Sequence, residues 1–382
     1  DEPQVQTMLM STIGNVYSSI GLYDSAEPLL NDALDLGDSV WGRQTSETAD
    51  ILFNIAELAR LRSNYSQAES LHREVLSIRE SSPTLDRSAI AESLHSLGLV
   101  LYYQGKYDEV APLYKRALKI YTDDFGEESE QVAGIYASLG SLMHSTNRYD
   151  EAEAYFKQSL TIYRNIYGSY HPKIASDLNN LAILYDEVGQ LDAARSAYEK
   201  SIAVFRHVYP GDHEFTAETL AHYASLIRFM GDSEAAESNY REAIAMLERT
   251  VGPEHMLTAR VKDSFGVFLF TSGRFDEAEP FIAESITVHR SLLGDRHINT
   301  ARVINNMASS LFLKGEYTDA QPYYRESLSI RLEVLGEDHA DDANSRNNLA
   351  DLLNRLGRYQ EAESLGKAAA DAYAASYSPE HW

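Results

Sequence analysis

The chain is 382 residues long, carries a formal net charge of −25 and contains no cysteine. Disulfides, thiolate chemistry and zinc–thiolate sites are therefore excluded, and so acidic a surface repels nucleic acid and anionic membranes at long range. No stretch approaches eighteen consecutive apolar residues, so we expect no membrane insertion and a cytoplasmic location. Residues 1–4 include neither a starting methionine nor an apolar signal core, so we expect a chain that is processed or cut from a longer protein.

A period of 42 residues runs through the whole sequence without slipping. Steps of 42 from Ala26 reach seven further alanines and one valine: Ala68, Val110, Ala152, Ala194, Ala236, Ala278, Ala320 and Ala362. A fixed period of this length predicts a repeat array, in which stability comes from contacts between neighbouring repeats. We expect one domain over 1–382, with units at approximately 1–44, 45–86, 87–128, 129–170, 171–212, 213–254, 255–296, 297–338 and 339–382.

In chain order, each unit is predicted to open with one helix and close with a second. In the fifth unit the first helix carries an apolar stripe that includes Leu178, Leu181 and Tyr185, and Gly189 ends it. The second helix carries a stripe that includes Ala194, Tyr198 and Ile202. We expect the Asp24-type column to cap the second helices and the Pro28-type column to lie near their first turn.

A second column admits only the two smallest side chains. It reads Gly14, Ala56, Gly98, Gly140, Ala182, Ala224, Gly266, Ala308 and Ala350. Such a restriction predicts that the two helices of each unit cross closely at this position. Ser63 occupies a turn column that otherwise holds only Gly or Asn, so it is the occupant least suited to a left-handed conformation.

These features resemble tetratricopeptide repeats, in the 42-residue form of kinesin light chains and many bacterial proteins. The resemblance lies in the Gly-x-Tyr-x-x-Ala turns, in the Leu-Asn-Asn-Leu-Ala segment at 178–182 and in loops such as 167–172. It implies an all-α, right-handed superhelical solenoid of nine helix-turn-helix repeats. The opening turn at 21–29 also resembles repeat regions that follow bacterial serine/threonine kinases.

Histidine recurs in the loops between units. The column reads His171, His213, His255, His297 and His339. Equivalent positions in stacked repeats are about 10 Å apart, whereas zinc ligands lie about 2 Å from the metal, so we expect these imidazoles to bond loop backbone and predict no metal site. The loop at 81–86 lacks both the Gly and the His, and 210–211 reads Pro-Gly; either segment is a bend or a local contact site.

No arrangement typical of catalysis is present. The sequence contains no Gly-x-x-x-x-Gly-Lys phosphate loop, no His-Glu-x-x-His and no Gly-x-Ser-x-Gly elbow. Acidic pairs such as 123–124 and 341–342 lie in loops or at helix starts, where carboxylates suit the helix dipole. We therefore expect a protein that is not an enzyme and needs no cofactor.

The resemblance implies that a ligand lies in the concave groove formed by the first helices. The candidate groove residues are Phe53, Arg60, His95, Tyr102, His144, Asn179, Ile183, Arg228, Asp263, Phe270, Asn305, Phe312, Asn347 and Asn354. The aromatic members suggest an exposed apolar strip, although tilted helices would instead bury these rings. The asparagines are suited to holding a peptide backbone, a role that Asn in this segment has in the light-chain family.

The charges of the predicted groove differ from the basic trough of kinesin light chains. Four arginines (Arg60, Arg228, Arg260 and Arg302) are opposed by six carboxylates (Asp50, Glu57, Glu92, Asp186, Glu218 and Asp263). Recognition of acidic cargo is therefore not expected here. A protein or extended peptide with aromatic, aliphatic or basic groups fits better, and nucleic acid does not.

We predict a non-catalytic scaffold that binds protein or peptide in this groove. The alternative is a regulatory or sensor arm of a larger signalling enzyme, such as a bacterial Ser/Thr kinase, whose catalytic domain lies outside these residues. A third possibility is self-association through the terminal repeats, because the last helix is small and Ala-rich at 368–370 and either Trp382 or another molecule would close it.

Overall fold

A computed structural model describes the backbone of residues 2–82, 86–335 and 340–376, and side chains over the same ranges except 335, 340–342 and 372–376. The chain divides into two compact units, Asp1–Gly189 and Gln190–Trp382. Within the described residues every regular element is an α-helix, as the repeat pattern predicts. The predicted closing residue Trp382 lies outside the described part, and a single solenoid over 1–382 stays a prediction.

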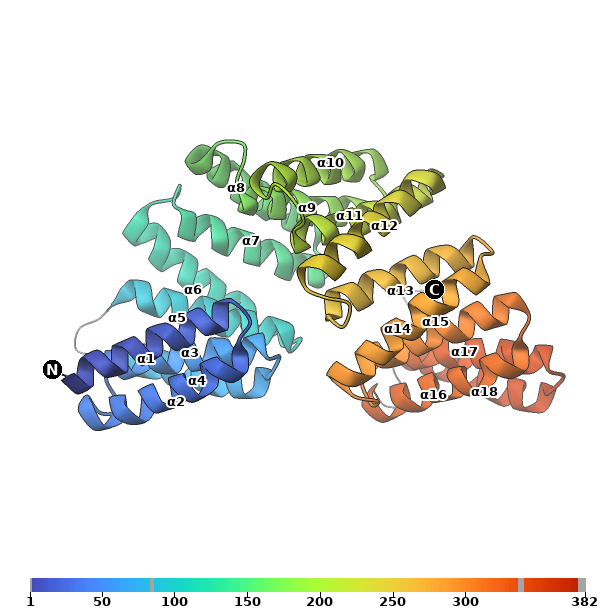
Figure 1. Cartoon of the computed structure of the whole chain (residues 1–382), viewed down its shortest axis with the longest axis horizontal. Coiled ribbons are helices and arrows are strands. Elements are labelled where there is room, and N and C mark those ends of the chain that lie inside the picture. The colour runs from blue at the N-terminus through green and yellow to red at the C-terminus, as the bar shows by residue number, and fades with distance from the viewer. Residues whose placement is uncertain (1, 83–85, 336–339, 377–382) are drawn as a thin grey trace. The chain divides into compact units, whose positions relative to one another are not determined.

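The helices follow one another as antiparallel pairs, one pair for each 42-residue repeat (Figure 1). Their bounds are α1 Glu2–Ser19, α2 Tyr23–Val40, α3 Ser46–Leu61, α4 Tyr65–Ser81, α5 Arg87–Tyr103, α6 Tyr107–Phe125, α7 Glu130–Ser145, α8 Tyr149–Tyr167, α9 Pro172–Glu187, α10 Leu191–Val208, α11 Glu214–Phe229, α12 Ser233–Thr250, α13 Met256–Thr271, α14 Phe275–Leu293, α15 Ile298–Lys314, α16 Tyr317–Leu335, α17 Ala340–Arg355 and α18 Tyr359–Ser376.

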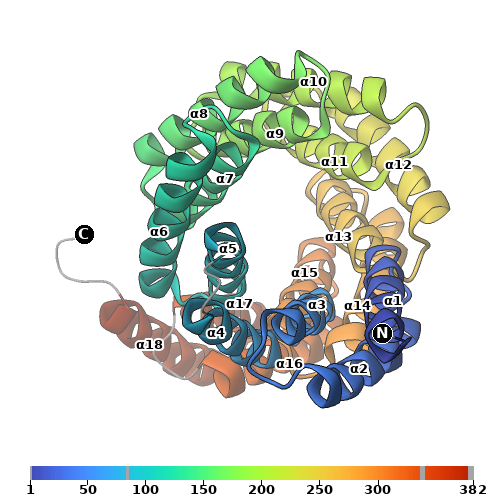
Figure 2. The ribbon, with the colours of Figure 1, turned by 90° about the vertical axis from the view of Figure 1, so that its left-hand side faces the viewer.

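Within each of the two compact units the helices form two layers. The odd-numbered helices contact one another in sequence, α1 to α3, α5, α7 and α9 in the first unit, and α11 to α13 and α15 in the second. Among the described residues no comparable contact joins successive even-numbered helices. The odd-numbered helices are therefore the more closely spaced layer, which we call the inner layer; Figure 2 shows α5 and α7 on the inner side of α6 and α8.

The small-residue columns fix how each pair packs. Ala26 and its eight counterparts are buried, eight of the nine completely. At the Gly14-type column the second helix inserts a large side chain: a Cβ placed on Gly98 would lie 2.4 Å from Cε1 of Tyr114. The predicted close crossing is thus confirmed, and in the first eight pairs the second helix places one large buried side chain at this level.

The turns also follow the columns. Ser63 and Asn147 take positive φ angles of 59° and 58°, the conformation that glycine adopts at the same column elsewhere. The loop histidines bond backbone as predicted: Nδ1 of His171, for example, accepts from the Lys173 amide at 3.3 Å and caps α9. The same cap begins α11, α13 and α15, while His339 lies outside the described residues.

Two predictions about the second helices are wrong. These helices begin one residue before the Asp24-type column, so Asp24 lies in the first turn of α2 and the capping position belongs to Leu22. The prolines lie further in, because Pro28 is inside α2, in its second turn.

Candidate functional site

Among the described residues, hydrogen bonds across 43 residues of sequence join six pairs of successive first helices. We call these contacts the lateral ladder: Ser11–Asn54, His95–Ser138, Tyr102–Ser145, His144–Glu187, Arg228–Thr271, Asp263–Asn306 and Asn305–Asn348. All lie in the inner layer, where the candidate groove residues were predicted. Six of those candidates are ladder members, so their polar groups bind a neighbouring helix.

Phe53 and Arg60 lie on α3 in the first unit, and both are half-buried. The Arg79 guanidinium lies 4.9 Å from the centre of the Phe53 ring, and the buried His72 ring meets Phe53 edge-on. Arg60 donates from Nε to Glu57 at 2.9 Å. Burial acts to raise the pKa of Glu57, but His72 and Arg60 outweigh it and lower that pKa to about 2, so Glu57 is a carboxylate at neutral pH.

Phe53, Glu57 and Arg79 line an open hollow of about 660 Å³ between α3 and α5, which we call the acidic hollow. Its carboxylates are Asp50, Glu57, Asp86 and Glu92, and Arg79 is the one cation among its described lining residues. Arg79 is only 6% exposed and donates to Asp50 and to Ser93, each at 2.8 Å. The hollow thus presents excess negative charge beside the Phe53 ring.

The remaining first-unit candidates lie on α5, α7 and α9. His95 bonds Ser138 through Nε2 at 2.7 Å, and burial lowers its pKa to about 4, so this imidazole is neutral. Tyr102 and His144 make equally short ladder bonds, to Ser145 and Glu187 respectively, as given above. The other two candidates, on α9, are half-buried: Asn179 and Ile183.

In the second unit two candidates prove inaccessible. Phe270 is 7% exposed and packs within the hydrophobic core, so the prediction that it belongs to an exposed strip is wrong. Burial is therefore the alternative that applies to this ring, of the two that the sequence left open. Asp263 is 1% exposed and pairs with Arg302 at 2.5 Å. Phe312 is half-buried against the same core, and Arg228 is half-buried over Phe229.

In the last described repeat the asparagine side-chain amides are exposed. Asn347 and Asn354 are exposed on α17 and line a hollow of about 650 Å³, the amide hollow, with Asp351, Tyr359 and Glu363. Gly366 also lines it. The eight earlier repeats hold a large buried side chain at that position: Leu30, His72, Tyr114, Phe156, Tyr198, Tyr240, Ile282 and Tyr324. A Cβ on Gly366 would meet nothing within 4 Å.

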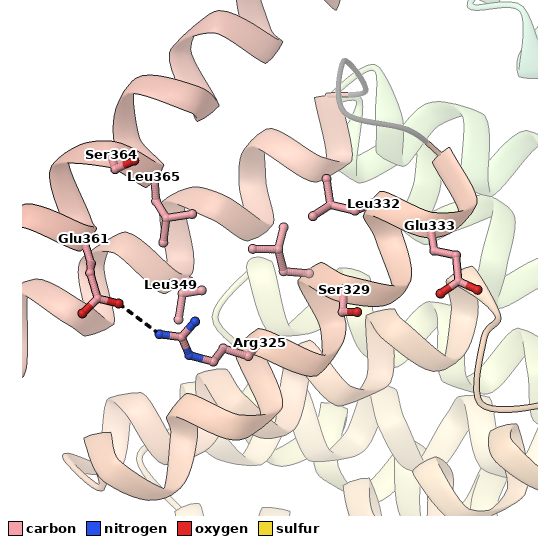
Figure 3. A pocket seen from close by; sticks show the side chains of 9 residues that line it. Arg325, Ser329, Leu332, Glu333, Leu349, Glu361, Ser364 and Leu365 are labelled. Carbon is pink, nitrogen blue, oxygen red and sulfur yellow. Dashed lines mark hydrogen bonds and ion pairs between the residues drawn. The ribbon is translucent and has the colours of Figure 1, made fainter.

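Sequence reasoning missed two features of the second unit. A hollow of about 680 Å³ between α16 and α18 has a floor that includes Leu328, Leu349 and Leu365, and an Arg325–Glu361 ion pair at 3.4 Å borders it (Figure 3). The other feature is Lys262, which is 4% exposed and bridges Glu248 and Glu284, each at 2.6 Å. The available signal was a charged residue in a column that holds leucine in four other repeats, at Leu52, Leu94, Leu178 and Leu220.

The described residues contain neither a cluster suited to a metal ion nor a helix suited to spanning a membrane. No group of three or more His, Cys, Asp or Glu side chains there is arranged to hold a metal ion. No helix among them has the length and apolar character needed to cross a membrane.

The fold and its inner face define a class of helical repeat protein, and sequence comparison identifies the family. The tetratricopeptide repeat model matches residues 5–81, 47–123, 89–165, 131–207, 188–249 and 300–375, and a second model with the same description matches 258–299. The chain therefore belongs to the tetratricopeptide repeat family. No curated protein sequence matches it.

Solved structures that resemble this chain differ widely from it in sequence. The apo quorum sensor NprR from B. thuringiensis is 12% identical over 95% of this chain and 97% of its own, with a TM-score of 0.62. A Rap protein complexed with Competence and Sporulation Factor is 13% identical over 97% and 98%, with a TM-score of 0.61. A putative kinesin light chain from Podosopora anserina is 19% identical over 53% and 97%, with a TM-score of 0.48.

Proposed function

We propose that this chain is a scaffold that binds an extended peptide or protein segment on its inner layer, with basic and aromatic side chains as the recognised groups. The observation that carries the proposal is the acidic hollow. Four carboxylates and a half-buried phenylalanine line it, and their charge is balanced only in part, by the buried Arg79 guanidinium and by Arg60, which pairs with Glu57. A lysine or arginine on the ligand would gain charge complementarity, and an apolar ring would gain contact with Phe53.

The amide hollow supports the same class of ligand in the second unit. Asn347 and Asn354 offer donors and acceptors that suit peptide backbone, and Asp351 and Glu363 add negative charge. The ladder members contribute differently, because their hydrogen bonds hold neighbouring inner helices in register. We therefore narrow the candidate site to Phe53 and the two hollows, and assign Asp263 and Phe270 to the framework.

The similar solved structures are consistent with such a role. One of them is a Rap protein in complex with Competence and Sporulation Factor, and another is a quorum sensor. The alternative, a regulatory arm of a larger signalling enzyme, is compatible with the same inner-layer binding and rests on the resemblance of the opening turn. Self-association through the terminal repeats stays a separate prediction.

The test measures fluorescence anisotropy of two labelled peptides, one alternating lysine with tryptophan and one alternating glutamate with tryptophan. We expect binding of the lysine peptide, weakening as salt rises, and none of the glutamate peptide. The Asp50→Asn/Glu92→Gln variant should bind on the order of tenfold more weakly, because it removes two charges while an amide oxygen still accepts from Arg79.

The matched control is Glu128→Gln/Asp319→Asn, which removes the same charge from two exposed positions that line none of the hollows described above. Equal losses in both variants would show a general effect of net charge and overturn the assignment to the acidic hollow. Equal affinity for the two peptides would overturn recognition of basic groups.

A further inference from the structure

A small polar cavity lies between α11 and α13, inside the second unit. Its volume is about 50 Å³, and its lining includes Ala221, His222 and Ser225 of α11 and Val261 and Ser264 of α13. One buried water needs about 10–15 Å³ of such space, so the cavity has room for a group of about three or four non-hydrogen atoms. An aromatic ring does not fit, whereas a small polar group does.

The cavity lies where the lateral ladder lacks a contact. The column of Ala221 supplies ladder members in other repeats, among them His95, Asp263 and Asn305. The partner position, 43 residues later, is Ser264. Because the Ala221 methyl group offers Ser264 neither a donor nor an acceptor, no ladder bond forms at this level. α11 and α13 are instead joined by Arg228 and Thr271, nearer the ends of the two helices.

One buried nitrogen at this cavity has no bonding partner. Nδ1 of His222 is buried and makes no hydrogen bond within the described part of the chain. Burial is the largest influence on this imidazole and lowers its pKa, so the ring is neutral at neutral pH. A neutral imidazole has one N–H donor and one acceptor nitrogen. An unpaired buried group of this kind costs stability, and a bound group that pairs with Nδ1 would remove that cost.

The charges around the cavity balance one another. Glu218 and Arg260 both line it and form an ion pair at 3.6 Å. An anion would compete with Glu218, and a cation with Arg260, for the partner that each already has, and burying an unpaired charge is costly. In the acidic hollow the same two columns hold Asp50 and Glu92. The two inner-layer sites therefore differ in the charge of the group that they favour.

A primary carboxamide meets these requirements. It is uncharged, and with two N–H donors and a carbonyl acceptor it can bond Nδ1 of His222 in either tautomer and the Ser264 hydroxyl at the same time. It also fills more of the cavity than a hydroxyl group does. We propose that the cavity is a ligand subsite for a primary carboxamide, the side chain of an asparagine or glutamine in the bound segment. The assignment to a peptide rests on the function proposed above.

The first test uses three small probes of similar shape and different charge: acetamide, acetate and acetamidinium, at constant ionic strength and neutral pH. The readout is the chemical shift of His222 Nδ1 in a long-range proton–nitrogen correlation spectrum, assigned with the His222→Gln variant. We expect a shift that saturates with acetamide and none that saturates with either ion. The absence of a saturable shift with acetamide would overturn the proposal, and so would an equal response to all three probes.

Three substitutions test the position of the subsite. Ala221→Asn supplies the missing ladder member, as Asn305 does in its own repeat, so it should fill the cavity and abolish the acetamide shift. The matched control is Ala137→Asn, at the other alanine of this column, which does not line the cavity and should leave acetamide binding unchanged. Ser264→Ala keeps the cavity and should weaken acetamide binding about threefold to tenfold. Acetamide binding that survives Ala221→Asn would overturn the assignment.

A second test addresses the peptide. Two labelled peptides, one alternating lysine with glutamine and one alternating lysine with methionine, have side chains of similar size and differ in the amide. Fluorescence anisotropy should show about threefold to tenfold tighter binding of the glutamine peptide, and Ala221→Asn should remove this preference. Equal binding of both by the wild-type chain would overturn recognition of a peptide carboxamide. Binding of neither would overturn the function proposed above, and the acetamide titration would still decide whether the cavity accepts a carboxamide.

Discussion

Asn306 on α15 donates a hydrogen bond from Nδ2 to Oδ1 of Asp263 on α13, 43 residues earlier, at 2.9 Å. The lateral ladder repeats this relationship in both units between successive first helices. Because Asp263 also pairs with Arg302, one buried carboxylate satisfies two groups of the next first helix. The inner layer is thus held by polar contacts, whereas each helix pair is held by its apolar column.

The Asp263→Ala variant should lower the free energy of unfolding by about 1–3 kcal/mol, because it leaves Arg302 and Asn306 without their acceptor. Urea unfolding measures the change. The Asp319→Ala variant, at an exposed position of α16, is the control and should lie within about 0.5 kcal/mol of wild type. An unchanged midpoint for Asp263→Ala would show that the ladder contributes nothing to stability.

Phe270 and Phe312 occupy the same column of the repeat, but their substitution by alanine should reduce stability by different amounts. Phe270→Ala removes a ring that is 7% exposed, so we expect a loss of about 3–5 kcal/mol. Phe312→Ala removes a half-buried ring and should cost less. Thermal unfolding of the two variants gives the comparison. Equal losses would mean that Phe312 also belongs to the core, and no loss at Phe270 would restore it to the groove.

Two glycine-to-alanine substitutions should change the free energy of unfolding in opposite directions. The Gly98→Ala methyl would meet the buried Tyr114 ring at 2.4 Å, so we expect a loss of about 1–3 kcal/mol from overpacking. The Gly134→Ala methyl meets only the Tyr163 hydroxyl, at 3.6 Å, and should stabilise α7 by up to about 1 kcal/mol. Denaturant melts of both variants test this, and the same sign for both would contradict the packing described here.

His95 should make the fold sensitive to mild acid. Its pKa is lowered to about 4 by burial, whereas in the unfolded chain it is about 6.5. Between those values the unfolded state takes up a proton and the native state does not, so stability falls as pH drops from 6.5 towards 4. His95→Gln should flatten this part of the stability–pH curve, measured by urea unfolding at successive pH values. An unaltered slope would exclude His95 as the cause.

The contribution of Asp177 to stability should change with pH in the opposite direction. Burial raises its pKa to about 7, against about 3.9 in the unfolded chain. The unfolded state loses this proton first, so the contribution of Asp177 is fully present below pH 3.9 and is lost as pH rises through 7. Asp177→Asn should therefore be more stable than wild type at pH 8, with the advantage shrinking towards pH 4. A constant difference across that range would contradict this assignment.

The repeat period predicted the fold because each column serves one packing contact. At the columns of Ala26 and Tyr114, the size of the side chain is limited by the other helix of the same hairpin. That constraint recurs every 42 residues. The histidine caps follow for the same reason, since each acts on the helix that begins one residue later. Local geometry of this kind can be read directly from the sequence.

The candidate site could be predicted only in part, because exposure depends on which neighbour covers a side chain. Phe53 and Phe270 both lie on first helices of the inner layer, yet one borders a hollow and the other is core. The hydrogen-bond partner of His95 lies 43 residues away on another helix, and no spacing within one repeat reveals it. The hollow beside Gly366 likewise appears only once α17 and α18 are packed together.

By itself the sequence determined the all-α repeat class, the helix pairs, the tight turns and the acidic character of the molecule, since these depend on local propensity, periodicity and composition. The tertiary structure decided which inner-layer side chains are engaged in the lateral ladder and where the hollows lie. Those properties depend on contacts between helices, which side chains distant in sequence make together.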